Sequence, residues 1–176
     1  SVHDPFLFED MKKVVDRLSK AVDNREIIGV FGDFDTDGLS GSAVLAFALE
    51  SLGAIVFPYI PHRVDEGHGV SINALDFFKD RGVSLMLTVD CGISSIEEID
   101  LANSMNIETI ISDHHTSVDN LPSAFAIINP SLPNSKYPFE HLTGVGTAFK
   151  IIEALFSYLG KDLPAEVYVF SAFGTL

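Results

Sequence analysis

The chain has 176 residues, enough for one domain with a sizeable core, and 47% of them are hydrophobic, which excludes a disordered chain. Its 25 acidic residues outnumber 11 basic ones, and the net charge of −14 argues against a nucleic-acid-binding protein that relies on a basic face. Its apolar runs are shorter than the roughly 18 residues that span a bilayer, so we expect no membrane segment. The single cysteine, Cys91, excludes an intramolecular disulfide and fits a cytoplasmic protein.

The first predicted element is an amphipathic helix within residues 8–22, where apolar residues recur at helical spacing. Runs rich in β-branched and aromatic residues then predict five strands, at 26–32, 54–60, 84–89, 107–112 and 124–128. Helices are predicted between them at 39–52, 71–81 and 95–105. Ser94 and Glu97 predict a capping box at the start of the last of these helices.

Strands that alternate with helices in this way predict an α/β fold. Because the strand runs are almost continuously apolar, the sheet should be mainly parallel and covered by helices on both faces. After Pro130 the pattern changes to a loop at 130–138 and then to helices near 145–159 and 164–173. We therefore expect a three-layer open sheet of about five strands, followed by C-terminal helices.

Three aspartates follow the first predicted strand at alternate positions, and Gly38 comes directly after them: Asp33, Asp35 and Asp37. A pair of like charges at ~4 Å costs about 1 kcal/mol in water and about 4 kcal/mol at an effective dielectric constant near 20. Such a cluster beside a buried strand favours a bound cation. The alternative is a solvated acidic turn that ends at Gly38.

Two further strands are followed by side chains of the same kind. Asp90 comes after the strand at 84–89, and Asp113, His114 and His115 come after the strand at 107–112. The carboxyl ends of parallel strands share one edge of a sheet, which is where open α/β sheets bind ligands. Aspartate and histidine that converge there predict a metal site with mixed oxygen and imidazole ligands.

Three other motifs fit less well. An EF-hand loop that began at Asp33 would need a glutamate where Val44 stands, and it would follow a helix instead of a strand. A haloacid-dehalogenase phosphatase also places Asp-x-Asp after its first strand, but it usually continues with Gly-Thr, where this chain has Thr36 and Asp37. Gly144 and Gly146 lack the third glycine and the preceding strand of a dinucleotide-binding fingerprint.

The motifs GDFDTDG at 32–38, VDCG at 89–92 and SDHH at 112–115 together resemble the DHH phosphoesterase superfamily. Other phrases resemble its RecJ branch, the single-strand-specific 5′→3′ DNA exonucleases; they lie at 3–6, 60–63, 66–69 and 144–150. The resemblance covers essentially the whole chain. What it implies about fold, metal and substrate therefore concerns the chain as a whole and not one motif.

The resemblance implies metal ligands at Asp35, Asp37, Asp90 and His114. Asp90 would be the bridging ligand and part of the catalytic centre, which would hold two Mn²⁺ or Mg²⁺ ions that activate water and neutralise the phosphodiester. Many members of the superfamily have a histidine where this chain has Phe31. The role of that histidine is either absent here or filled by Asp33, which is a weaker ligand candidate than the other four residues.

Three other residues are candidates for contact with the substrate. His115 would contact the phosphate or act as an acid, with support of His114 as the alternative. Arg63 is a candidate phosphate clamp, because a guanidinium matches two phosphate oxygens, and a surface ion pair is its alternative. His68 lies between two glycines on a loop that would meet the nucleic acid, unless it is simply exposed to solvent.

The resemblance also implies a domain organisation. Residues 1–176 would be a DHH catalytic domain that stops before the last metal-ligand motif, without the remaining domains of the full protein. We therefore expect the isolated piece to bind metal poorly and to be inactive.

The full protein would be a cytoplasmic exonuclease that digests single-stranded DNA from its 5′ end to mononucleotides in recombination and repair. A DHH hydrolase of short oligonucleotides, cyclic dinucleotides or pyrophosphate is the second interpretation, which the acidic composition favours. A non-catalytic DHH scaffold is the third, against which the clustered charges argue.

Overall fold

The computed structural model describes residues 3–62, 67–116 and 120–174. Its centre is one sheet in the order β2-β1-β3-β4-β5, in which every pair of neighbouring strands is parallel. The strands are β1 (Ile27–Gly32), β2 (Ile55–Tyr59), β3 (Val83–Val89), β4 (Glu108–Ser112) and β5 (Ala126–Ile128). The predicted α/β fold with a five-stranded parallel sheet is therefore confirmed.

The described α-helices agree with the predicted ones in number and place. They are α1 (Met11–Asp23), α2 (Thr36–Ser51), α3 (Ile72–Asp80), α4 (Ile96–Ser104), α5 (Gly144–Leu159) and α6 (Ala165–Phe173), and the short 3₁₀ helix η1 (Pro5–Leu7) precedes them. The longest of them, α2 and α5, have 16 residues each, and no helix in the described ranges combines the length and apolar character needed to cross a membrane.

Helix α1 begins at Met11, three residues later than predicted, and the N-termini of α2 and α4 also differ from the prediction. Helix α2 begins at Thr36 and not at 39, because the Asp35 carboxylate accepts a hydrogen bond from Gly38 N at 2.9 Å and caps the first turn. The capping box predicted at α4 is wrong. Ser95 precedes this helix, but its hydroxyl accepts a hydrogen bond from Val70 N at 3.1 Å instead of bonding within the helix.

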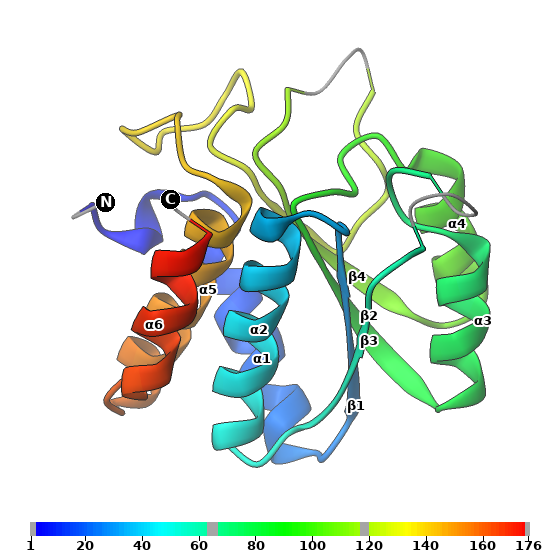
Figure 1. The fold of residues 1–176 in the computed structure, drawn as a ribbon, viewed down its shortest axis with the longest axis horizontal. Coiled ribbons are helices and arrows are strands. Elements are labelled where there is room, and N and C mark those ends of the chain that lie inside the picture. Colours follow the sequence, from blue (N-terminus) through cyan, green and yellow to red (C-terminus); the bar gives the residue numbers. More distant parts are fainter. Residues whose placement is uncertain (1–2, 63–66, 117–119, 175–176) are drawn as a thin grey trace.

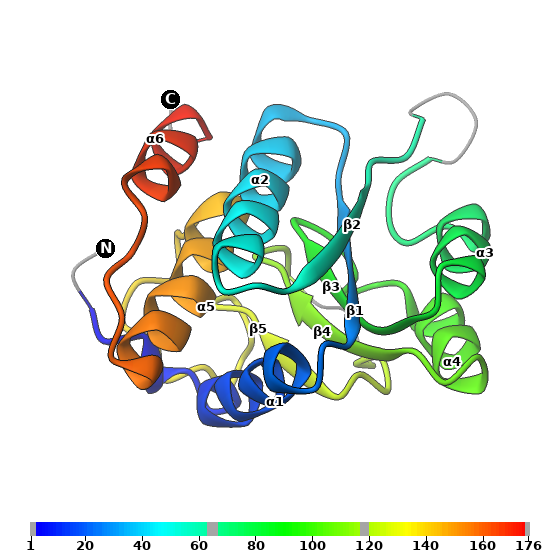
Figure 2. The same ribbon diagram turned by 90° about the horizontal axis from the view of Figure 1, so that it is seen from below.

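The helices cover both faces of the sheet, as Figures 1 and 2 show. One face packs against α1, α2 and α5 in the larger apolar core, which includes Leu18, Leu45 and Ile151. The other face packs against α3 and α4 in a second core around Phe78. A Cβ atom on Gly29 would lie 2.8 Å from the Phe78 ring, so the glycine lets α3 approach β1 closely.

The strand order fixes where a site can form. The chain goes from β1 outward to β2, and then returns past β1 to β3. The connections that leave the carboxyl ends of β1 and β3 therefore turn toward opposite faces, through α2 and α4. Open α/β sheets bind ligands in the crevice at such a switch in strand order. The predicted acidic residues lie at this crevice.

Candidate metal centre

Three aspartates lie one residue beyond the ends of three neighbouring strands. Asp33 N donates to Val89 O at 3.2 Å, Asp90 N donates to Ser112 O at 2.9 Å, and Asp113 N donates to Ile128 O at 3.1 Å. Each of these hydrogen bonds continues the pairing of two parallel strands by one residue. The sheet therefore places the backbones of the three aspartates side by side along its edge. All three residues are buried.

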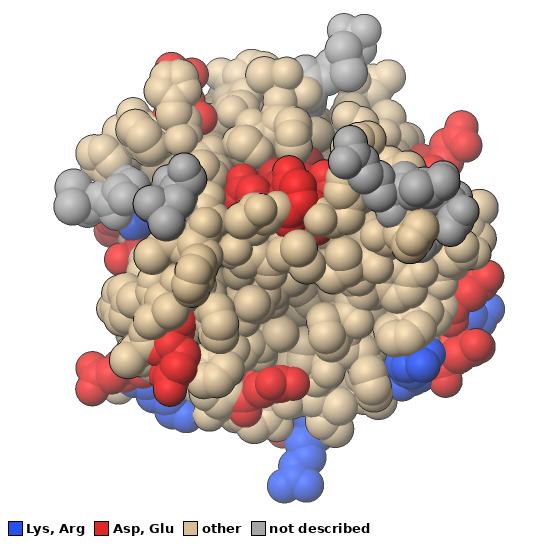
Figure 3. Space-filling model, in the orientation of Figure 1, with Lys and Arg blue, Asp and Glu red and all other residues tan. Residues whose placement is uncertain are grey.

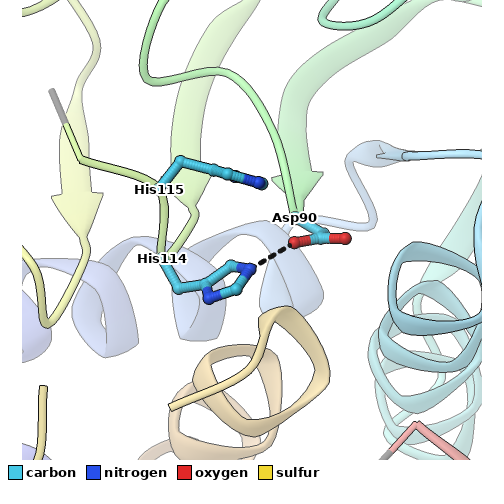
Figure 4. Close-up of side chains that lie close together, drawn as sticks. All are labelled: Asp90, His114 and His115. Atoms are coloured by element: carbon cyan, nitrogen blue, oxygen red, sulfur yellow. Dashed lines mark ion pairs between the residues drawn. The ribbon is translucent and has the colours of Figure 1, made fainter. Parts of the chain in front are cut away.

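Asp90 has a constrained backbone. Its φ is 61°, in the left-handed region that an aspartate seldom adopts. The Thr88 hydroxyl donates to Cys91 O at 2.8 Å and so closes the turn around Asp90. The Asp90 side chain is only 3% exposed, and its Oδ1 atom lies 2.9 Å from His114 Nε2 (Figure 4).

The ionisation of Asp90 and His114 is coupled. Burial raises the pKa of the Asp90 carboxyl, as does the nearby charge of Asp37, while His114 opposes this shift. The Asp90 carboxylate raises the pKa of His114, against the effect of burial. A positive charge beside Asp90, from His114 or from a bound cation, therefore offsets the cost of burying its carboxylate.

Asp113 connects the residues around it. Its Oδ2 atom accepts a hydrogen bond from Ile93 N at 3.0 Å, and its Oδ1 atom accepts from His114 N at 2.7 Å and His115 N at 3.1 Å. The same Oδ1 lies 2.7 Å from His115 Nδ1, which leaves Nε2 as the ring nitrogen of His115 that can face a ligand. This connecting role of Asp113 was not predicted from the sequence, in which the two histidines beside it were the only signal.

Asp37 lies at the start of α2 and contacts a helix that is remote in sequence. Its two carboxylate oxygens accept hydrogen bonds from Gly144 N and Val145 N, both at 2.7 Å, in the first turn of α5. Asp37 Oδ2 also lies 3.9 Å from His114 Nε2. A Cβ atom on Gly144 would lie 2.5 Å from Asp90 Cβ, so only glycine lets α5 come this close to the centre. The sequence analysis had not found this use of Gly144.

The donor atoms form two groups that fit metal ions. Asp90, His114 and His115 bring ligand atoms within 4.8 Å of one another, and so do Asp33, Asp35 and Asp90. Asp90 belongs to both groups, and its buried Oδ1 accepts no hydrogen bond within the described residues despite its approach to His114. An unpartnered buried carboxylate oxygen among further carboxylates and imidazoles suits Mn²⁺ or Mg²⁺.

Two of the three predicted substrate residues line a cleft of about 400 Å³ beside these groups. His115 and His68 line it together with Asp33 and Asp90. His68 is 77% exposed, with its Nδ1 atom 3.5 Å from Asp33 Oδ2 and its ring 4.8 Å from that of Phe34, centre to centre. Arg63, the predicted phosphate clamp, lies outside the described residues.

The distribution of charge agrees with this placement. Figure 3 shows acidic side chains gathered in the upper centre of one face, above the carboxyl ends of the strands in Figure 1, while Lys and Arg appear near the lower and outer edges. A cluster of this kind repels a bare phosphate and attracts divalent cations. A phosphodiester substrate would therefore need the cations in order to bind.

Comparison with known proteins agrees with the motifs. The family model of the DHH family, N-terminal domain, matches residues 27–175. The single-stranded-DNA-specific exonuclease RecJ of Bacillus subtilis (strain 168) is 41% identical over 174 residues, which are 99% of this chain and 22% of that protein. The chain thus spans less than a quarter of the length of this relative.

Solved structures show the same likeness. A crystal structure of exonuclease RecJ bound to manganese superposes with a TM-score of 0.86 at 36% identity, over 96% of this chain and 43% of that chain. RecJ from Thermus thermophilus in complex with Mn²⁺ gives a TM-score of 0.80 at 32% identity, over 96% of this chain and 24% of that chain. From the family match over most of its length, together with the parallel sheet and the convergent carboxylates and histidines, we conclude that this chain belongs to the DHH family and contains its N-terminal domain.

Proposed function

We propose that this chain is the metal-binding catalytic domain of a single-strand-specific DNA exonuclease. The observation that carries the proposal is Asp90, a buried carboxylate shared by two groups of potential metal ligands that come from three strands. The similarity to single-stranded-DNA-specific exonucleases supports single-stranded DNA as the substrate. We further propose that the full protein digests it from the 5′ end, in repair and recombination in the cytoplasm.

We propose that two Mn²⁺ or Mg²⁺ ions are held by Asp33, Asp35, Asp37, Asp90 and His114. Bound there, the ions would activate water and neutralise the charge of the phosphodiester. Asp37 can take part while it still accepts hydrogen bonds from α5, because each carboxylate oxygen has two lone pairs.

The chain itself would orient the reacting groups. The turn closed by Thr88 fixes Asp90 between the two donor groups, and Asp113 fixes the ring of His115. His115 lines the cleft and can hold a proton on Nε2 toward a phosphate or a leaving oxygen. The cleft would admit the end of a single DNA strand, beside the rings of His68 and Phe34.

The direct test uses the full-length protein that contains this domain. It should release nucleotides from 5′-labelled single-stranded DNA with Mn²⁺, and much more slowly from a duplex. Asp90→Asn should lower the rate by roughly 100-fold or more, because removal of a ligand charge disrupts both donor groups. Asp100→Asn, on the exposed side of α4, is the matched control and should keep full activity. Equal rates for the two variants would refute the proposal.

A second function is a hydrolase of short oligonucleotides, cyclic dinucleotides or pyrophosphate, and the net charge of −14 favours it over a long polyanionic substrate. The rates on a long single strand and on a dinucleotide, compared at equal concentration, separate the two functions. A non-catalytic scaffold would show neither activity and no stoichiometric binding of Mn²⁺.

A further inference from the structure

Among the described residues, the hydrogen bonds that hold the backbone of the His114–His115 dipeptide come from side chains. Both of its N–H groups donate to Asp113 Oδ1, at 2.7 and 3.1 Å. Its two carbonyl oxygens accept hydrogen bonds from the loop after β5: Ser131 Oγ donates to His114 O at 2.7 Å, and Asn129 Nδ2 donates to His115 O at 2.9 Å. All four polar backbone groups of the dipeptide therefore have hydrogen-bond partners. These partners are side-chain atoms and not the backbone of a neighbouring strand or helix.

Asn129 is well suited to this contact. It is only 1% exposed, and its Oδ1 atom accepts a hydrogen bond from Ser131 N at 2.8 Å. A flipped amide would turn its oxygen toward His115 O and its nitrogen toward Ser131 N, so the contacts allow only one orientation. Asn129 also follows β5 directly, and β5 is tied to β4 by the bond from Asp113 N to Ile128 O at 3.1 Å.

The position of the two imidazoles depends on this backbone. The dipeptide follows β4 after Asp113, where the chain leaves the sheet, so the ladder of β4 and β5 no longer restrains it. His114 Nε2 nevertheless lies 2.9 Å from Asp90 Oδ1, and Figure 4 shows both rings on the side of the chain that faces Asp90. A rotation of either peptide plane would turn a ring away from Asp90.

We propose that Asn129 and Ser131 are positioning residues that fix His114 and His115 for metal and substrate. This inference rests on the proposed function, since it assigns a use to the two rings. It extends the centre to β5 and the loop behind it, which had no role in the site derived from the motifs.

The test uses the full-length protein and Mn²⁺ as the probe. Asn129→Asp replaces the donor with an acceptor of the same shape, and Ser131→Ala removes the hydroxyl. We expect each variant to bind Mn²⁺ about 10- to 100-fold more weakly, as measured by electron paramagnetic resonance, and to lose a similar factor in kcat with KM for single-stranded DNA little changed. Ser131→Thr keeps the hydroxyl and should bind Mn²⁺ like the wild type.

Matched controls lie in the same loop. Asn134 is exposed, and Ser135 accepts a hydrogen bond from Tyr137 N at 3.3 Å. Asn134→Asp and Ser135→Ala repeat the two chemical changes away from the histidines and should keep wild-type affinity. Thermal unfolding of the metal-free variants separates misfolding from misplacement. If Asn129→Asp fails to fold, the contrast between Ser131→Ala and Ser131→Thr decides.

The outcomes separate this inference from the proposed function. If the wild type digests DNA but Asn129→Asp and Ser131→Ala bind Mn²⁺ as tightly as the controls, the positioning role is refuted and the nuclease stands. If the wild type binds Mn²⁺ without nuclease activity and these two variants bind it more weakly, the positioning role is supported and the proposed function is refuted.

Discussion

Gly144 shows how the absence of one side-chain atom shapes the centre. An added Cβ would meet Asp90 Cβ at 2.5 Å and Asp90 Cγ at 2.6 Å. Asp90 has no room to move, because it is buried and already held in a left-handed conformation. At Gly146, two residues further along the same helix, an added Cβ would meet nothing closer than 3.3 Å in the described part of the chain.

Gly144→Ala should therefore destabilise the protein by about 1–3 kcal/mol through overpacking, and it should weaken the binding of Mn²⁺. Gly146→Ala is the control, and it should cost much less, because Leu142 and Thr143 need to shift by only a few tenths of an ångström and alanine favours a helix by about 0.5–1 kcal/mol. Urea unfolding of both variants measures the difference. Equal stability would show that α5 can move away from Asp90 at little cost.

Asp113→Asn should also be costly. The carboxylate accepts three backbone N–H groups, and an amide can offer only one oxygen to them. The NH₂ group would then face Ile93 N or the histidine backbone, which leaves a buried donor unpaired. We expect a loss of about 2–3 kcal/mol in the free energy of unfolding. Asp76→Asn, on the exposed side of α3, should change it little, and a small effect of Asp113→Asn would contradict the connecting role.

At the scale of elements, an ion-pair network joins α1 to the sheet at the end opposite the metal centre. Arg17 Nη2 lies 2.7 Å from Glu26 Oε2, next to β1, and Arg17 Nε lies 2.6 Å from Glu108 Oε2 on β4. The Arg17 guanidinium lowers the pKa of Glu26, with a further contribution from the Ser84 hydroxyl. The network is therefore sensitive to acid.

Arg17→Met should lower the free energy of unfolding by about 1–2 kcal/mol at neutral pH, because two partly exposed carboxylates lose their partner. The pKa of Glu26 lies below its ordinary value of 4.5 in the folded protein, so this stabilisation is present above about pH 4.5 and is lost as the pH falls through the folded pKa. Stability curves of wild type and variant should then converge in acid. Lys12→Met breaks a more exposed pair, with Asp16, whose pKa is lowered by Tyr158 and then by Lys12, so its curves should converge to a smaller extent.

At the scale of the whole molecule, the net charge of −14 opposes compaction, and the acidic cluster concentrates part of that repulsion at one edge of the sheet. Salt reduces it by screening, whereas a metal ion bound at the centre adds its own binding free energy.

Mn²⁺ at 100 times its dissociation constant should stabilise the protein by about 2.7 kcal/mol, well beyond the effect of NaCl at the same ionic strength. Melting temperatures in MnCl₂, NaCl and EDTA measure this difference. Asp90→Asn should remove it and leave the response to NaCl unchanged, because only the specific site is lost. A rise in melting temperature with Mn²⁺ that matches NaCl would refute a specific metal centre.

The sequence was sufficient for the elements and for the edge of the sheet that carries the site. Apolar runs predicted the strands, helical spacing predicted the helices, and the residues that follow Phe31, Val89 and Ser112 placed the acids and histidines at strand ends. These features are local, so a short stretch of chain encodes each of them. The capping box at Ser94 failed because the N-cap of α4 is Ser95, and the Ser95 hydroxyl accepts from Val70 N, 25 residues away, instead of capping the helix.

The sequence by itself thus determined that aspartates and histidines end parallel strands. The tertiary structure decided the strand order, which makes β1, β3 and β4 neighbours, and it decided which partners hold the site: α5 at Asp37, and Asn129 with Ser131 at the two histidines. The physical reason is that hydrophobic periodicity specifies which face of an element is buried, but not which remote segment covers it. Contacts between a side chain and a distant backbone form only when the whole sheet is assembled.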